Sequence, residues 1–184
     1  MYRVTLVVLF YILILGMAEI FGMPPKEAYQ SYLEEDFASS IAVGRPIAED
    51  KGFMSVFNSE SGVTACQTLM GHLYSDGHGV PQDDKTAREW YKIAADQGHP
   101  TAQYNLGYAY HRGFGVARNY ETALKWYSLS NKAGDEKAPF QTAMIHLWRE
   151  DAPEDWSSAN EMLMLSADRG YTAAYCQLGR LWSN

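Results

Sequence analysis

The sequence predicts an all-α fold, a right-handed α-solenoid of stacked antiparallel helix pairs, and three observations support this prediction. The segment that begins at Leu69 returns in similar form 36 residues later, at Asn105. Within this period the apolar residues are spaced as they are on helices, and glycines recur where two helices would turn. A fixed period of this length is typical of helical hairpins that stack on one another.

The repeated positions keep one phase along the chain. Four of these positions carry glycine, tyrosine, alanine or a Trp-Tyr pair: Gly71 recurs as Gly107 and Gly179, Tyr74 as Tyr110, Ala87 as Ala123 and Ala159, and Trp90-Tyr91 as Trp126-Tyr127. Because no gap has to be adjusted between copies, we infer that each copy is the same structural unit.

The first half of the period has the pattern of an amphipathic helix. Ala102, Leu106 and Tyr110 are four residues apart, which places them on one face of a helix. Gly107 lies beside them and would let a neighbouring helix approach closely.

The second half of the period also predicts a helix. Ala123, Trp126 and Tyr127 form a stripe that would face a core. Three residues in one phase can cap the start of this helix with a side-chain oxygen: Asp83, Asn119 and Asp155. Four glycines in another phase are expected at the left-handed position that follows a helix end: Gly62, Gly98, Gly134 and Gly170.

Together these residues form the motif A-x3-LG-x2-Y-x2-G-x-GV-x6-A-x2-WY, which runs from Ala102 to Tyr127. On this motif the chain resembles the Sel-one-like repeat (SLR) family, a subclass of tetratricopeptide-like (TPR-like) α-solenoids. The third unit departs from the motif, since Arg149 and Asp151 replace the loop glycines. The resemblance implies an adaptor or scaffold role, and some exported members of the family are periplasmic immunity proteins that neutralise a toxin.

The N-terminus has the features of a secretory signal peptide. Arg3 precedes the apolar run 4–15, and Gly16-Met17-Ala18 is a small-x-small arrangement. Residues 1–18 are therefore expected to be a cleaved signal peptide, and the alternative is an uncleaved anchor that extends to about residue 23. Either outcome places the repeats outside the cytoplasm, in a periplasmic, secreted or membrane-anchored protein.

The rest of the chain divides into a capping region and the repeats. Residues 24–62 are expected to form N-terminal capping helices, because Phe37 and Ile41 belong to an i, i+4 apolar series that should end before Gly44 and Pro46. The repeats, residues 63–184, are predicted at about 63–98, 99–134 and 135–170, with a C-terminal half repeat after them.

Composition and motifs exclude several classes of function. A formal net charge of −7 argues against a nucleic-acid partner, which would demand a basic surface. The histidines and cysteines lack the spacing of metal ligands, and the Ser-x-x-Lys and Lys-Thr-Gly motifs of β-lactam-binding enzymes are absent from the sequence. We therefore predict no enzyme activity, no catalytic residue, no cofactor and no metal. Cys66 and Cys176 are expected to be free thiols, with Cys66 buried in the phase of Ala102.

A local apolar stripe is the candidate binding surface. Projection of the first helices at 100° per residue places six residues on the side opposite the core face: Tyr104, Tyr108, His111, Phe140, Met144 and Leu147. Such a stripe is typical of a protein-binding surface. The alternative is that Tyr104 and Phe140 pack between adjacent repeats.

The most economical prediction of function is an exported protein-binding solenoid that acts as an adaptor or scaffold without catalysis of its own. A periplasmic immunity protein is the first alternative. An enzyme that acts on cell-wall material or β-lactams is the alternative of another class, and it would need a nucleophile and base that the motifs do not supply. The expected partner is another protein, with membrane contact only through an uncleaved leader.

Overall fold

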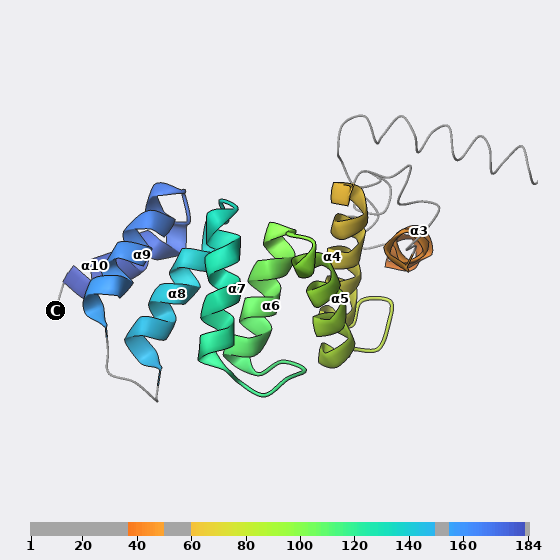
Figure 1. Ribbon diagram of the computed structural model, residues 1–184, viewed down its shortest axis with the longest axis horizontal. Coiled ribbons are helices and arrows are strands. Elements are labelled where there is room, and N and C mark those ends of the chain that lie inside the picture. Colours follow the sequence, from red (N-terminus) through yellow and green to blue (C-terminus); the bar gives the residue numbers. More distant parts are fainter. Residues whose placement is uncertain (1–36, 50–59, 150–154, 183–184) are drawn as a thin grey trace, which may run out of the picture. The chain divides into compact units, whose positions relative to one another are not determined.

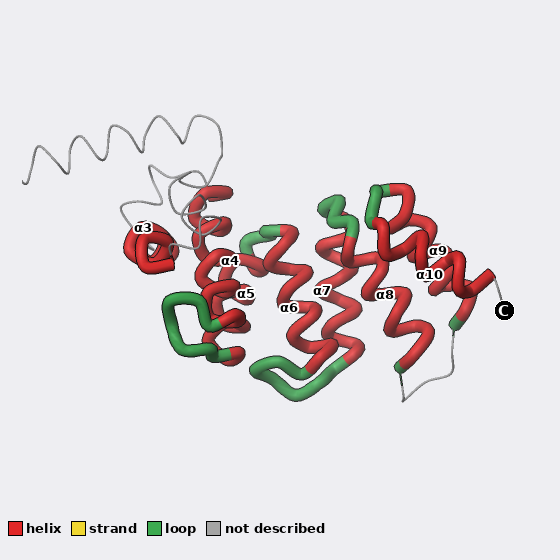
Figure 2. The backbone as a smooth tube through the Cα atoms, turned by 180° about the vertical axis from the view of Figure 1, so that it is seen from behind, coloured by secondary structure: helices red, strands yellow, loops and turns green. Residues whose placement is uncertain are grey.

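The computed structural model describes residues 37–49, 60–149 and 155–182, and every element in these ranges is a helix, as Figures 1 and 2 show. The helices are α3 (Phe37–Glu49), α4 (Glu60–Asp76), α5 (Asp84–Asp96), α6 (Pro100–Arg112), α7 (Tyr120–Lys132), α8 (Lys137–Trp148), α9 (Trp156–Asp168) and α10 (Thr172–Trp182). The predicted all-α helical-repeat fold is confirmed. The expected leader lies outside the described residues, and none of the described helices has the length and apolar character needed to cross a membrane.

The chain divides into two compact units, residues 1–97 and 98–184. In the first unit, α4 packs against both α3 and α5. Its core consists of small and large apolar side chains that are almost fully buried: Ala48, Val63, Cys66, Leu69, Met70 and Leu73. Phe37 and Ile41 of α3 pack against this core, and the Phe37 ring stacks on the His78 ring with 4.2 Å between centroids.

Two helix boundaries in the first unit differ from the prediction. α3 continues through Gly44 and Pro46 to Glu49, because Ala48 is buried against α4 and tertiary packing outweighs the low helix propensity of both residues. Gly62 does not follow a helix end, since α4 already begins at Glu60. Gly62 instead lies in the first turn of α4, where the amide groups have no intrahelical partner.

The second unit contains α6 to α10, and each helix packs against the next one along the chain. One core cluster joins Ala123 and Tyr127 of α7 to α8, and another joins α8, α9 and α10. Tyr127 has no exposed surface, whereas Trp126 is only half-buried. The predicted core stripe of α7 is therefore correct for Ala123 and Tyr127, and the tyrosine is its main anchor.

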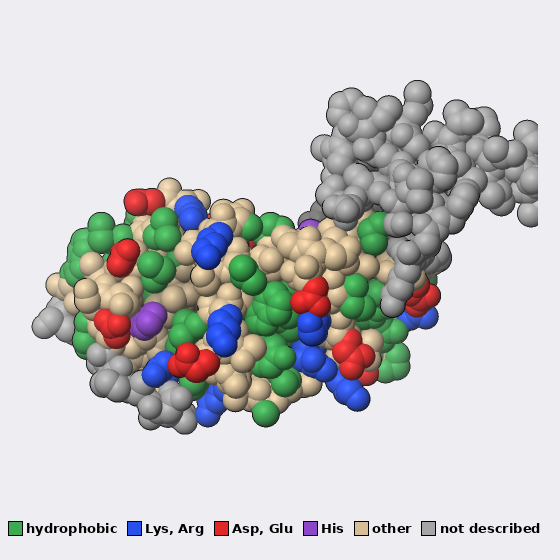
Figure 3. Space-filling view, in the orientation of Figure 1, with side chains coloured by type: hydrophobic (Ala, Val, Ile, Leu, Met, Phe, Trp, Pro, Cys, Tyr) green, Lys and Arg blue, Asp and Glu red, His purple; other side chains and the backbone are tan. Residues whose placement is uncertain are grey.

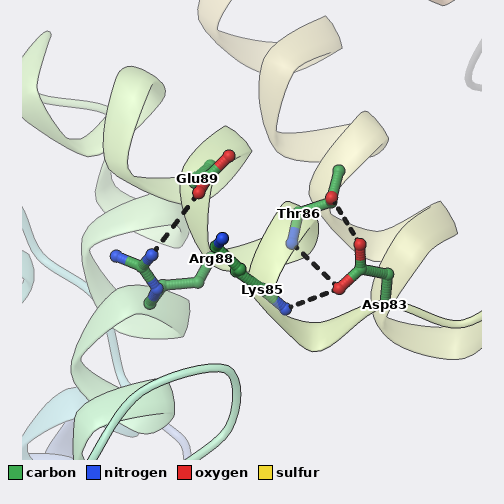
Figure 4. Close-up of polar contacts among 5 residues, drawn as sticks. All are labelled: Asp83, Lys85, Thr86, Arg88 and Glu89. Atoms are coloured by element: carbon green, nitrogen blue, oxygen red, sulfur yellow. Dashed lines mark hydrogen bonds and ion pairs between the residues drawn. The ribbon is translucent and has the colours of Figure 1, made fainter.

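The predicted caps and turns are present in both units. The Asp83 carboxylate accepts hydrogen bonds from the amides of Lys85 and Thr86 at 3.0 and 3.3 Å and from the Thr86 hydroxyl at 2.6 Å, as Figure 4 shows. These bonds, the one from the Thr86 hydroxyl first, lower the pKa of Asp83 below its ordinary value. Asn119 and Asp155 cap α7 and α9 in the same way. Three helix ends are followed by glycines with φ near +90°: Gly98, Gly134 and Gly170.

A glycine and a tyrosine explain why the two helices lie so close in the α4–α5 and α6–α7 pairs. A Cβ atom placed on Gly107 would lie 2.8 Å from two ring carbons of Tyr127. The same contact joins Gly71 to Tyr91 in the first unit, one period earlier. The repeated Gly and Tyr therefore form one packing device, in which the ring occupies the space that a side chain would fill.

Buried hydroxyl groups form a second repeated contact. The Ser130 hydroxyl of α7 donates to the Pro100 carbonyl at 3.0 Å, and Ser166, one period later in α9, donates to the Glu136 carbonyl. Each bond joins the second helix of a pair to the start of the first helix. It also satisfies a fully buried polar group.

Both cysteines are free thiols, as predicted. Cys66 is 1% exposed and occupies the phase of Ala102 and Ala138, which are also buried. Burial raises the pKa of the Cys66 thiol to about 12, so this side chain acts as a small packing residue.

Candidate binding site

The six residues predicted to bind a partner lie on two helices of the second unit. Tyr104, Tyr108 and His111 belong to α6, and Phe140, Met144 and Leu147 belong to α8. Five of them are half-buried, and Leu147 is buried.

Leu147 is excluded from the binding surface because it is only 1% exposed. It belongs to the core cluster that contains Ala159 and Leu163 of α9. The helical projection considers only the first helices of the pairs, such as α6 and α8. It leaves out α9, the second helix of its pair, which covers part of α8. Leu147 is therefore a core residue, and its placement in the binding stripe was wrong.

Tyr104 and Phe140 have contacts that match the packing alternative. The Tyr104 ring lies 5.8 Å from the Tyr127 ring, and burial raises the Tyr104 pKa to about 12, partly offset by a hydrogen bond with Gln141 of α8. The Phe140 ring meets the Tyr171 ring edge-on at 5.2 Å, ahead of α10. Both side chains hold neighbouring helices together.

His111 and Met144 lie in the wall of a cavity of about 540 Å³. The cavity is formed by the end of α6, the loop that joins α6 to α7, the start of α7, and α8; Figure 2 shows this loop in green. Its wall contains basic, aromatic and apolar side chains: His111, Arg112, Phe114, Arg118, Tyr120, Gln141, Met144, Ile145, Trp148 and Arg149.

Three guanidinium groups give the cavity its charge: Arg112, Arg118 and Arg149. Arg118 lies over the Tyr120 ring, 5.4 Å from its centroid, which holds the guanidinium at the cavity wall. Arg149 donates to the Glu121 carboxylate at 3.2 Å, and that glutamate side chain is 72% exposed. On the face that Figure 3 shows, basic and acidic side chains lie among hydrophobic ones over α6, α7 and α8.

Two large apolar side chains of the cavity are open to solvent. Phe114, in the loop after α6, is 44% exposed, and Trp148, at the end of α8, is 57% exposed. The Tyr108 ring lies 5.9 Å from the Phe114 ring and extends the aromatic surface along α6. Exposed aromatic groups beside arginine are typical of the residues that contribute most to protein interfaces.

His111 contributes no charge to the cavity near neutral pH. Burial, together with the positive charges of Arg112 and Arg118, lowers the pKa of His111 from 6.5 to about 4. Its Nδ1 atom lies 3.4 Å from the Tyr127 hydroxyl, and its ring meets the Tyr120 ring at 5.8 Å. The imidazole therefore supports the buried tyrosine from the cavity wall.

The basic and aromatic character of this cavity is specific to the second repeat. One period earlier, Asp76 stands in the phase of Arg112, and Gln82 stands in the phase of Arg118. The phase of Phe114 holds His78. The turn between the helices of the pair therefore forms without these side chains, so folding alone does not account for them.

The face projection missed Arg112, Arg118 and Trp148. They lie at helix ends or in a loop, where the 100° rule no longer describes direction. A comparison between repeats could have found them, because a residue that changes charge between two copies of one turn stands out from the repeat.

Chemically, the cavity wall offers guanidinium donors and ring faces. These groups bind carboxylates and apolar side chains. Within the described residues, no cluster of three metal-ligating side chains is present.

A Sel1 repeat family model matches residues 64–99 and 100–135. A solved Sel1 repeat protein from Oxalobacter formigenes is similar over 86% of this chain and 60% of its own, with 26% identity and a TM-score of 0.70. A protective antigen of uropathogenic Escherichia coli strains that displays an SLR fold is similar over 86% of this chain and 36% of its own, with 27% identity and a TM-score of 0.63. The chain thus spans less than two thirds of either protein. No functionally curated protein gives a significant match.

Proposed function

We propose that this chain, which carries two Sel1 repeats, functions by binding another protein through the cavity between α6, α7 and α8. Sel1 repeat proteins are typically protein-binding and without catalysis. The observation that carries the proposal is the combination of Phe114 and Trp148, both large and exposed, with arginines in one cavity. Such a surface supports an adaptor or scaffold role, in which the chain holds a partner without changing it chemically.

Site-specific photo-crosslinking tests this proposal. A photo-reactive phenylalanine derivative at position 148 replaces one large exposed ring by another, so the fold is retained. Met164 of α9 offers a matched control, since it is 47% exposed and outside the cavity wall. We expect a discrete protein adduct from position 148, formed in cells of the source organism, and none of the same mass from position 164. Equal adducts from both positions, or none from position 148, would contradict a partner site at this cavity.

We also propose that the protein acts outside the cytoplasm. The support is the leader, with Arg3 ahead of the apolar run 4–15 and a small-x-small site that ends at Ala18. Cell fractionation followed by N-terminal sequencing tests this proposal. The expected product is an exported chain that begins at Glu19. An intact chain in the membrane fraction would support the anchor alternative, and an intact chain in the soluble cytoplasmic fraction would refute export.

A further inference from the structure

We propose that the cavity between α6, α7 and α8 binds an acidic peptide segment of the partner, with carboxylates at Arg112 and Arg118 and an adjacent apolar side chain against Phe114 and Trp148. This inference rests on the proposed protein-binding function and specifies the chemistry of the partner.

The wall of the cavity is positively charged. The chain as a whole has a formal net charge of −7, yet the described wall of the cavity contains three arginines and no Asp or Glu. Glu121, which pairs with Arg149, lies outside that wall. Complementarity therefore favours an anionic partner, and the planar guanidinium groups favour carboxylates, which they bind through two parallel hydrogen bonds.

The positive charge of the cavity wall does not depend on pH in the neutral range. A guanidinium group keeps its proton throughout the neutral range. Among the described residues of the wall, the other titratable groups are His111 and Tyr120, with the Tyr108 ring and the Tyr127 hydroxyl beside His111. His111 is neutral above a pH of about 4. Recognition by the arginines is therefore expected to be sensitive to salt and insensitive to pH between 6 and 8, which is roughly the neutral range.

The two repeats differ in the side chains at this turn. At the phases of Arg112, Arg118 and Phe114, the first repeat carries Asp76, Gln82 and His78, and its α4–α5 turn nonetheless forms. Asp76 and Gln82 lack the positive charges of Arg112 and Arg118, and His78 lacks the apolar ring of Phe114. The second repeat thus differs from the first in the groups that would contact an acidic and apolar segment.

The size of the cavity suits a short peptide segment. A cavity of about 540 Å³ lies within the range of roughly 300 to 1,000 Å³ that binds compact ligands, so it has room for a few side chains of a peptide. A bound peptide would cover the exposed surfaces of Phe114 and Trp148. Burial of this apolar surface would add binding free energy that a small carboxylate anion could not provide. The mixture of charge and apolar surface therefore favours a peptide over a small anion.

Selection from a library of random short peptides tests the inference, because it can be carried out before the natural partner is identified. The full chain is immobilised as the wild type and as the double variant Arg112→Asp, Arg118→Gln, which installs the residues that the first repeat carries at these phases. We expect wild-type selections to be enriched in Asp and Glu next to an aromatic or large aliphatic residue. A selected peptide should bind the double variant at least about tenfold more weakly, which is a loss of about 1.4 kcal/mol.

Two further measurements keep the result interpretable. Phe114→His, which also installs the first-repeat residue, should weaken binding while the acidic enrichment persists, and circular dichroism verifies that each variant is folded. Peptides selected without acidic enrichment, or equal binding to wild type and double variant, would overturn the inference. Competition by citrate as tight as that by the selected peptide would assign the arginines to small anions and also overturn it.

The outcomes separate this inference from the proposed function. A protein adduct from position 148 combined with peptides that ignore the arginines would leave the binding function in place and refute the acidic partner. Absence of both the adduct and selected peptides would refute both proposals.

Discussion

The contact between Gly107 and Tyr127 predicts that Gly107→Ala lowers the free energy of unfolding. A control variant in the same unit, Gly179→Ala, is expected to raise it. In Gly107→Ala, the new methyl carbon would lie 2.8 Å from two carbons of a ring that has no exposed surface. The Ala123 carbonyl oxygen would lie 3.3 Å from the same methyl carbon. The ring cannot move freely, because Tyr104 and His111 pack against it at 5.8 and 6.2 Å.

The expected magnitude follows from two opposing effects. Overpacking of a buried site of this kind costs about 2 to 3 kcal/mol. Alanine has a better helix propensity than glycine by about 1 kcal/mol, which offsets part of that cost. We therefore expect Gly107→Ala to lower the free energy of unfolding by about 1 to 2 kcal/mol.

Gly179 is the matched control because it occupies the same phase in α10. A Cβ atom there would meet nothing within 4 Å among the described residues. Gly179→Ala should therefore raise the free energy of unfolding by up to about 1 kcal/mol, through helix propensity alone. Urea unfolding followed by circular dichroism measures both variants. A Gly107→Ala protein as stable as the Gly179→Ala protein would refute the packing argument.

Three more predictions concern residues of α6 and α7. Asn119→Ala removes the side-chain oxygen that accepts from the Thr122 amide at 2.8 Å, and it should lower the free energy of unfolding by about 1 kcal/mol in urea melts. Tyr127→Ala should cost about 3 to 5 kcal/mol, and Trp126→Ala clearly less, because only the tyrosine is fully buried. The folded chain holds the pKa of His111 near 4 while the unfolded chain titrates near 6.5, so the unfolded state binds more protons between these values. Because solvent partly screens this half-buried ring, the free energy of unfolding should rise by only roughly 1 to 2 kcal/mol as the pH is raised across that interval. In urea melts of His111→Asn, the free energy of unfolding should depend less on pH.

Much of the fold follows from the period because the repeated residues act through local geometry. Asp83, Asn119 and Asp155 cap helices through their own backbone neighbours, and a local pattern is enough to predict that. Boundaries that depend on distant contacts were missed. α3 extends past Gly44 and Pro46 because Ala48 packs on α4, a contact that no local rule contains.

The lining of the cavity was predicted only in part, for a related reason. Helix projection places residues relative to one helix axis, and two of the residues that it selects, His111 and Met144, line the cavity. It failed for Leu147, which α9 covers. It could not bring Phe114 of the loop together with Trp148 of α8, because their proximity to the cavity depends on how α6, α7 and α8 pack.

Crosslinking from position 148 shows directly whether a partner protein binds at the cavity through Arg112 and Arg118. The photo-reactive residue is placed at position 148 in the wild-type background and in the Arg112→Asp, Arg118→Gln background, and adduct yield is compared at equal protein level. We expect the partner adduct in the first background and a loss of at least about tenfold in the second, since the variant removes both guanidinium groups and adds one carboxylate. An adduct of the same mass and equal yield in both backgrounds would contradict the account.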